Sequence, residues 1–123
     1  MNYDVARAVM DPQTTRALGG IVAIDHYVDT PNKLINNIEA LAALTGGKIF
    51  LGEMGVPIPD INGDMTDKEQ ADWIQEALLR LSKEPAVVGL NYWVGFGGST
   101  QLWNYDWTPR EAVSVLNKFF KAK

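Results

Sequence analysis

Polar and aromatic side chains stand at three points of the chain where an apolar run ends. They are Asp25, His26 and Tyr27, then Glu53, and then Asn91 and Trp93. A carboxylate can act as a nucleophile or a proton acceptor, a tyrosine hydroxyl can orient it, and an indole can stack on a ligand. If these three kinds of side chain converge, they form a candidate catalytic or binding site.

Three predicted strands must bring these side chains together. The segments 21–28, 48–53 and 86–94 are rich in β-branched, aromatic and other apolar residues, which is typical of strands. Each segment begins apolar and turns polar at its carboxyl end. The strands are nearly continuous apolar runs, as expected when both faces of a parallel sheet are covered.

Helices are expected between the strands, at 12–18, 31–45, 67–82 and 109–121. The first two begin with an N-cap residue followed by proline, in Asp11-Pro12 and Thr30-Pro31. Thr66 and Glu69 form a capping box, and a second such box at 108–111 includes Pro109. Glycine pairs end the first two helices.

The alternation of helices and strands predicts an α/β fold with a parallel sheet. Ligand sites in such folds lie at the carboxyl ends of the strands. Because side chains alternate along a strand, one consistent assignment places Tyr27, Glu53 and Trp93 on the same face. The same alternation places Glu53 on the face of Ile49 and Leu51.

The bulk composition limits the classes of function. The 123 residues fit a single domain, 1–123, of which 46% are apolar and 21% charged, with net charge −4. No basic patch suggests nucleic acid, and we expect neither a signal peptide nor a membrane-spanning segment in these residues. Cysteine is absent and His26 is the only histidine, which argues against a thiolate or multi-histidine metal site. Nothing requires a metal or an organic cofactor.

A structural interpretation of each candidate residue stays open. A glutamate at a strand end is often a solvated rim residue, and His26 fits a packed, hydrogen-bonded role better than a proton shuttle. Trp93 could belong to the core, and Asp25 could cap a helix. The functional interpretation depends on the joint pattern rather than on any one residue.

The three strand ends together resemble retaining glycoside hydrolases of the cellulase-like superfamily. The segment 49–57 (IFLGEMGVP) resembles their seventh strand, in which a glutamate, a variable residue and a glycine follow an aliphatic run. The segment 88–93 (VGLNYW) resembles their eighth strand, and 24–27 (IDHY) their sixth. The resemblance extends from about residue 11 onward and implies the C-terminal portion of a (β/α)₈ barrel. Within that superfamily, the resemblance points first to enzymes of the endoglucanase and mannanase type.

The resemblance implies a role for each residue. Glu53 is the nucleophile of a double-displacement reaction on β-linked glycans, and Tyr27 donates a hydrogen bond to it. Trp93 stacks on a sugar ring, while Asp25, His26 and Asn91 contact sugar hydroxyls. Trp103, with Tyr105 and Trp107, extends the substrate-binding surface or, equally, packs the loop.

The chain departs from the family pattern in two respects. Such barrels have eight strands, and only three are found here. The acid/base glutamate, which follows an asparagine in the family, has no counterpart, so we expect the isolated chain to be inactive or weakly active. The open sheet would also expose Ile49 and Leu51. We therefore expect the chain to associate with itself or with a missing N-terminal half of the barrel.

Two further interpretations stay open. The chain could be a non-catalytic carbohydrate-binding or scaffold module derived from such a barrel, or an unrelated small α/β domain. In either enzymatic or binding form its partner is an oligo- or polysaccharide. Full-length relatives are often secreted, but the compartment, sugar and linkage are not fixed by this sequence.

Overall fold

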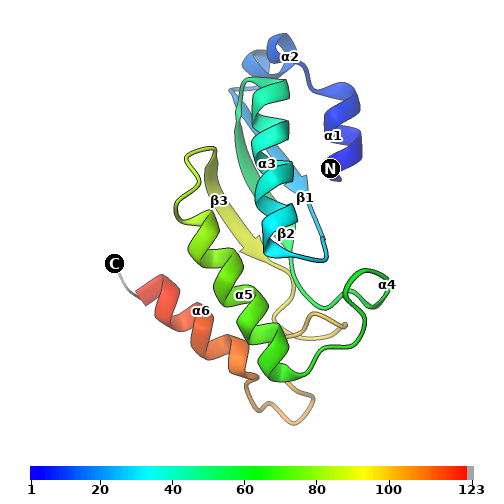
Figure 1. Ribbon diagram of the computed structural model, residues 1–123, viewed down its shortest axis with the longest axis vertical. Helices are drawn as coiled ribbons and strands as arrows, with labels where there is room; N and C mark the ends of the chain where they lie inside the picture. Colours follow the sequence, from blue (N-terminus) through cyan, green and yellow to red (C-terminus); the bar gives the residue numbers. More distant parts are fainter. Residues whose placement is uncertain (122–123) are drawn as a thin grey trace.

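The computed structural model describes residues 1–121 as a parallel three-stranded sheet covered by helices (Figure 1). The last two residues of the predicted single domain, 122 and 123, lie outside the described part. The elements in chain order are α1 (Tyr3–Val9), α2 (Pro12–Ala17), β1 (Ile21–Asp25), α3 (Pro31–Thr45), β2 (Lys48–Met54), α4 (Pro59–Asn62), α5 (Asp67–Leu81), β3 (Val87–Tyr92) and α6 (Glu111–Lys121).

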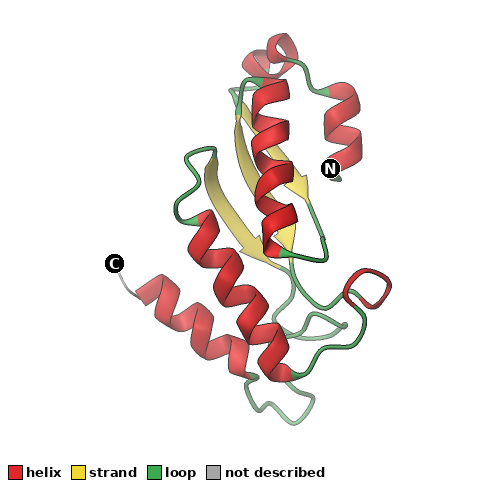
Figure 2. Ribbon diagram, in the orientation of Figure 1, coloured by secondary structure: helices red, strands yellow, loops and turns green. Residues whose placement is uncertain are grey.

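The predicted α/β class and the three parallel strands are confirmed. The strand order is β1-β2-β3, and both neighbouring pairs are parallel. Helices α3 and α5 connect these strands and lie on one face of the sheet (Figure 2). Such helical crossovers are what parallel strands require.

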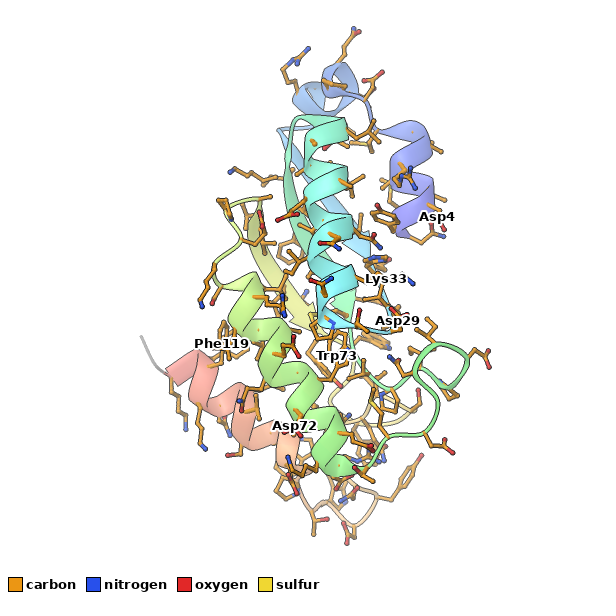
Figure 3. All side chains as sticks on the ribbon, viewed as in Figure 1. Asp4, Asp29, Lys33, Asp72, Trp73 and Phe119 are labelled. Atoms are coloured by element: carbon orange, nitrogen blue, oxygen red, sulfur yellow. The ribbon has the colours of Figure 1, made fainter. Side chains whose placement is uncertain are left out.

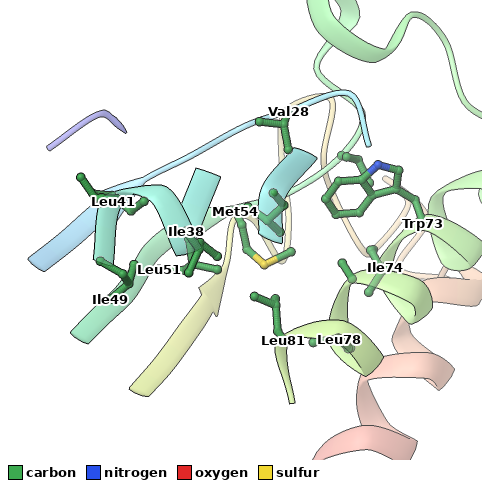
Figure 4. Close-up of a cluster of buried hydrophobic side chains, with 14 of the residues drawn as sticks. Val28, Ile38, Leu41, Ile49, Leu51, Met54, Trp73, Ile74, Leu78 and Leu81 are labelled. Carbon is green, nitrogen blue, oxygen red and sulfur yellow. The ribbon is translucent and has the colours of Figure 1, made fainter. Parts of the chain in front are cut away.

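The core lies between the sheet and this helical layer (Figure 4). The strand residues Val22, Ile24, Ile49 and Leu51 are at most 1% exposed. They meet a stripe of apolar residues from the helices, which includes Ile38, Leu41, Ile74, Leu78 and Leu81. Spacings of three and four residues place such side chains on one face of each helix.

The predicted start signals position α2, α3 and α5 as expected. The Asp11 carboxylate accepts a hydrogen bond from the Thr14 amide, and the Thr30 hydroxyl accepts one from the Lys33 amide. The capping box of Thr66 and Glu69 is formed in full. Helix α3 has the predicted bounds, 31–45, and ends at Gly46, whose φ of 65° lies in the left-handed region that glycine tolerates.

Several predicted boundaries are wrong. The first strand ends at Asp25 instead of residue 28, and β3 covers 87–92 instead of 86–94. The last helix begins at Glu111, because Pro109 instead pairs with Trp103 in an antiparallel bridge. Helices α1 and α4 lie in segments for which no helix was predicted, and both are short.

The predicted exposure of Ile49 and Leu51 is also wrong, since both are 0% exposed beneath the helices. The opposite face of the sheet instead presents Ile21, 50% exposed, and Val88, 51% exposed, with Phe50 partly covered. We call this the open sheet face. None of the helices in residues 1–121 is long and apolar enough to span a bilayer.

Candidate active site

An irregularity in the sheet determines where Glu53 points. Ile24 pairs with Leu51, but the next residue, Asp25, pairs with Glu53, so Gly52 is an extra residue in β2. A bulge of this kind reverses the alternation of side chains beyond it. Glu53 is accordingly half-buried on the open sheet face, and Met54, 1% exposed, points to the helices. Glu53 therefore does not share a face with Ile49 and Leu51, contrary to the prediction.

Glu53 is held by a single tyrosine. The Tyr27 hydroxyl, in the loop after β1, donates a hydrogen bond of 2.8 Å to Oε2 of Glu53. Burial raises the pKa of Tyr27 above its usual value of 10, and the hydrogen bond and the charge of Glu53 raise it further. Tyr27 therefore stays protonated and acts as a donor. Among the described residues, no group donates to Oε1, the other carboxylate oxygen.

The backbone around Gly55 joins Trp93 to the strand that carries Glu53. The Trp93 amide donates to the Met54 carbonyl over 2.8 Å, and a Cβ on Gly55 would overlap with the Trp93 carbonyl oxygen. Only glycine fits at position 55 in this backbone arrangement. The Trp93 side chain is 51% exposed, which leaves an indole surface free beside the glutamate strand.

Asp25 and Asn91 lie on the strands that flank the bulge. Asp25 pairs with Glu53, and a Cβ on Gly52 would lie 2.9 Å from the Asp25 carboxylate. The Asp25 carboxylate also lies 3.5 Å from the amino group of Met1. Asn91 precedes Tyr92, the partner of Met54, and is exposed. Both polar side chains are thus available at the same end of the sheet as Glu53.

His26 is not part of this group, contrary to the prediction. It is 8% exposed, and its ring stacks on Tyr3 of α1 at 4.6 Å. Its Nε2 lies 3.0 Å from the side-chain amide of Asn37 on α3. Burial lowers the pKa of His26 below 6.5. The ring packs under the helices, which is the structural interpretation that the sequence had left open.

Trp103 lies in the long β3–α6 loop, residues 93–110. Its amide, like that of Leu102, donates to the Gly95 carbonyl, and its backbone pairs with Pro109. The side chain is 37% exposed. Within residues 1–121, neither a hydrogen bond nor a ring-stacking contact joins the Trp103 side chain to Glu53, Tyr27 or Trp93.

Two residues that the sequence prediction missed hold the loops around the site. The buried amide nitrogen of Gln70, on α5, lies 2.8 Å from the Val56 carbonyl and 3.2 Å from the Thr100 carbonyl. The Tyr92 hydroxyl reaches the same two carbonyls at 3.0 and 2.8 Å. Burial raises the pKa of Tyr92 to about 12. The signal in the sequence was a glutamine four residues before Ile74, on the apolar stripe of its helix.

The loop after β1 is fixed from the helical side. The indole nitrogen of Trp73 donates to the Asp29 carbonyl over 2.9 Å, and the Asp29 carboxylate lies 3.5 Å from the Lys33 ammonium group (Figure 3). This loop carries Tyr27, so these contacts help to position the donor to Glu53.

The arrangement offers one oriented carboxylate, that of Glu53, and not the pair of carboxyl groups that retaining glycoside hydrolysis uses. Retaining enzymes place two carboxyl groups about 5 Å apart on opposite sides of the scissile bond. Asp25 pairs directly with Glu53 on the neighbouring strand, so the two carboxylates lie on the same side of the site. Among residues 1–121, no group of three or more potential metal ligands is present.

The fold is similar to parts of glycoside hydrolases of known structure. An endo-β-1,3-glucanase of family GH128 from Sorangium cellulosum matches with a TM-score of 0.66 and 18% identity, over 85% of this chain and 41% of that one. A GH128 oligosaccharide-binding protein from Trichoderma gamsii matches with a TM-score of 0.69 and 13% identity, over 84% and 42%. A GH2 β-galacturonidase from Eisenbergiella tayi matches with a TM-score of 0.63 and 14% identity, over 85% and 24%.

No protein-family model matches the sequence, and no curated protein matches it either. The chain spans less than half the length of each of the three structures described above. At these identities the similarity establishes the fold. The chain has the architecture of part of a glycoside hydrolase (β/α)₈ barrel, which confirms the fold that the sequence resemblance implied.

Proposed function

We propose that this chain carries the nucleophile side of a retaining glycoside hydrolase site for β-linked glycans. The observation that carries the proposal is the hydrogen bond of 2.8 Å between the Tyr27 hydroxyl and Glu53, at the carboxyl end of the parallel strands. This hydrogen bond holds the carboxylate in one orientation, and Oε1 stays free to attack.

In the proposed reaction, Oε1 of Glu53 attacks the anomeric carbon and forms a glycosyl ester. The bond to the departing oxygen breaks, and that oxygen takes a proton from a general acid. Water then attacks the ester, gives up its proton to the same group, and releases the sugar with Glu53 restored. Tyr27 donates to Glu53 throughout and keeps it ionised and oriented.

The general acid is expected from outside residues 1–121. Asp25 is on the wrong side, and no asparagine–glutamate pair occurs in the sequence. We propose that a second copy of the chain, or a further barrel segment, covers the open sheet face. A further barrel segment would supply the acid, whereas a second copy need not recreate the catalytic pair. Alone, the chain should turn over substrates slowly if at all.

The proposed substrate class is supported by the neighbouring residues and by the structures with a similar fold. An exposed indole such as that of Trp93 can stack on the apolar face of a sugar ring, and Asn91 and Asp25 can bind its hydroxyls. One matched structure is an endo-β-1,3-glucanase and another a β-galacturonidase, so both act on β-linked sugars. Cellulose- and mannan-type chains belong in the same test panel.

The test uses aryl β-glycosides with good leaving groups, which need little help from an acid. We expect slow release of the aryl group by the wild-type chain and none by Glu53→Gln. A matched control is Glu39→Gln, because Glu39 is an exposed glutamate on α3. Equal release by wild type and Glu53→Gln would rule out Glu53 as the nucleophile.

A second candidate function is glycan binding without catalysis. It is favoured by the match to an oligosaccharide-binding protein of the same GH128 family and by the missing acid. In that case, Glu53→Gln would leave glycan affinity intact and Trp93→Ala would reduce it, with no aryl release by any variant. Tryptophan fluorescence that stays constant during an oligosaccharide titration would contradict it.

A further inference from the structure

The β3–α6 loop carries a second group of aromatic side chains that the proposed active site does not use. Phe96 stacks on Trp107 with ring centroids 4.6 Å apart and an interplanar angle of 10°, and Tyr105 meets Phe96 edge-on at 5.6 Å. We call these three residues the aromatic platform. It lies in the loop at the end of the sheet to which the strand arrows point (Figure 1).

These aromatic rings are exposed and lie outside the core. Tyr105 is 74% exposed, Trp107 68% and Phe96 41%. None of the three belongs to the hydrophobic core or to the residues packed against it. The sequence left two roles open for Tyr105 and Trp107, which were to extend the substrate-binding surface or to pack the loop. Loop packing explains their contacts with Phe96 but not their large exposed area. Large aromatic surfaces that remain in water mark interaction sites.

The loop backbone holds the platform in place. The Trp107 amide donates to the Asn104 carbonyl over 2.9 Å, and the Asn104 amide donates to the Thr108 carbonyl over 2.9 Å. The Asp106 carboxylate accepts from the Thr108 amide at 3.0 Å and from its hydroxyl at 2.6 Å. These bonds close residues 104–108 into a tight turn, so the backbone that carries Tyr105 and Trp107 has little freedom to lose on binding.

The backbone conformation of Trp107 independently supports a role for this residue in ligand contact. Its φ is 66°, in the left-handed region that bulky side chains rarely adopt, and among the described residues it is the only non-glycine residue with positive φ. Such conformations persist where the surroundings enforce them, and they cluster at ligand-contacting positions. At position 107 a glycine would adopt this φ without strain, yet the residue is a tryptophan whose indole is 68% exposed.

The platform is close enough to the candidate active site to bind the same ligand. Phe96 follows Trp93 by three residues, so their Cα atoms are at most about 11 Å apart. The platform combines flat apolar rings with the polar residues Asn104 and Asp106 of the same turn, whose side chains also bond to Thr108 and Arg110. A pyranose ring has the same combination, with C–H groups on its faces and hydroxyls around its edge.

We infer that Phe96, Tyr105 and Trp107 form an outlying sugar-binding platform that takes a distal unit of the β-linked chain whose scissile unit lies at Glu53 and Trp93. This inference rests on the proposed function, because it assigns the same glycan to both places. Binding at the platform lengthens the stretch of polysaccharide that the chain recognises, and it does not require Glu53 to be reactive.

The test is native affinity electrophoresis of the 123-residue chain in gels that contain soluble β-1,3-glucan, hydroxyethyl cellulose or glucomannan. The main variant is Trp107→Gly, which removes the indole and suits the positive φ, so the fold should be kept. Tyr105→Ala removes the second ring. The matched control is Phe120→Ala, because Phe120 is 52% exposed but lies on α6. Circular dichroism checks the fold of each variant.

We expect Trp107→Gly to weaken retention by at least one glycan roughly tenfold, as is usual when a central aromatic contact is lost. Tyr105→Ala should have a smaller effect, and Phe120→Ala none. Retention that Trp93→Ala abolishes and Trp107→Gly leaves unchanged would overturn the platform but keep the proposed function. Retention lost in Trp107→Gly and unchanged in Trp93→Ala would overturn the inferred link between the platform and the site at Trp93, whereas the nucleophile proposal is tested separately by aryl release from Glu53→Gln.

Two other results would also overturn the inference. One is the absence of retention of the wild-type chain by every glycan. The other is self-association that Trp107→Gly abolishes while glycan retention stays unchanged, since that would make the platform a contact between protein chains. Sedimentation velocity on the same samples separates this second result from glycan binding.

Discussion

At the scale of single residues, Glu53 and Tyr27 are two predicted site residues whose side chains are hydrogen-bonded directly to each other. The sequence resemblance implied a hydrogen bond between them, and the structure contains it at 2.8 Å. The catalytic role of the pair remains a proposal. The sequence resemblance also placed His26 near the glutamate, but β1 ends at Asp25, and the His26 side chain packs against Tyr3 of α1 and Asn37 of α3 instead.

The packing of His26 leads to a pH prediction. Burial lowers the pKa of His26 below 6.5; the charge of Asp4 opposes this lowering in part, and the charge of Lys33 adds a smaller lowering. Because the folded chain binds this proton less well than the unfolded chain, the stabilisation is complete above pH 6.5 and is lost as the pH falls through the folded-state pKa. The melting temperature should therefore fall on acidification below pH 6.5.

The single histidine makes this measurement direct. Proton NMR should show one imidazole that titrates below pH 6.5, and His26→Gln should reduce the slope of melting temperature against pH in that range. An imidazole that titrates at or above 6.5 would contradict the buried, uncharged state that the Asn37 contact indicates.

At the scale of elements, the sequence predicts helix starts well where capping residues close to each other in the chain determine them. Thr30 with Pro31, and Thr66 with Glu69, are complete start signals, and α3 and α5 begin where these residues indicate. The same type of signal failed at Pro109, because the backbone there pairs with Trp103 before the helix starts. Tertiary pairing of this kind has no local sequence signature.

The bulge at Gly52 is the element-scale feature that matters most for the site. A strict alternation along β2 would have buried Glu53 with Leu51 beneath the helices. The pairing of Asp25 with Glu53 shows one extra residue, and a glycine there leaves room for the Asp25 carboxylate. The sequence contains Gly52, and a glycine in a strand can mark a bulge. It does not reveal whether the bulge forms or where the pairing with the neighbouring strand shifts.

At the scale of the whole molecule, the open sheet face is what separates this chain from a closed barrel. Ile21 is 50% exposed and Val88 51%. Full burial of such a side chain contributes about 1.5–3 kcal/mol, so a few of them on one face favour association. The exposed strand edges act in the same direction.

We therefore expect the chain to self-associate when it is studied alone. Sedimentation velocity should give a mass that rises with protein concentration above the 13.6 kDa of one chain. Val88→Lys should shift the equilibrium toward the monomer, whereas Leu79→Lys, at a residue 52% exposed on α5, should not. A monomeric mass at every concentration would contradict this prediction and show that the open sheet face stays solvated in the isolated chain.

The most direct measurement of nucleophilic reactivity is the intact mass of the chain after incubation with an activated 2-deoxy-2-fluoro β-glycoside. The good leaving group removes the need for an acid, and the fluorine slows hydrolysis of the glycosyl ester, so a competent nucleophile is trapped. We expect the mass to increase by one fluorosugar, with the label on Glu53, and no label on Glu53→Gln. An unchanged mass with gluco- and manno-configured probes alike would contradict a nucleophilic Glu53 in this chain.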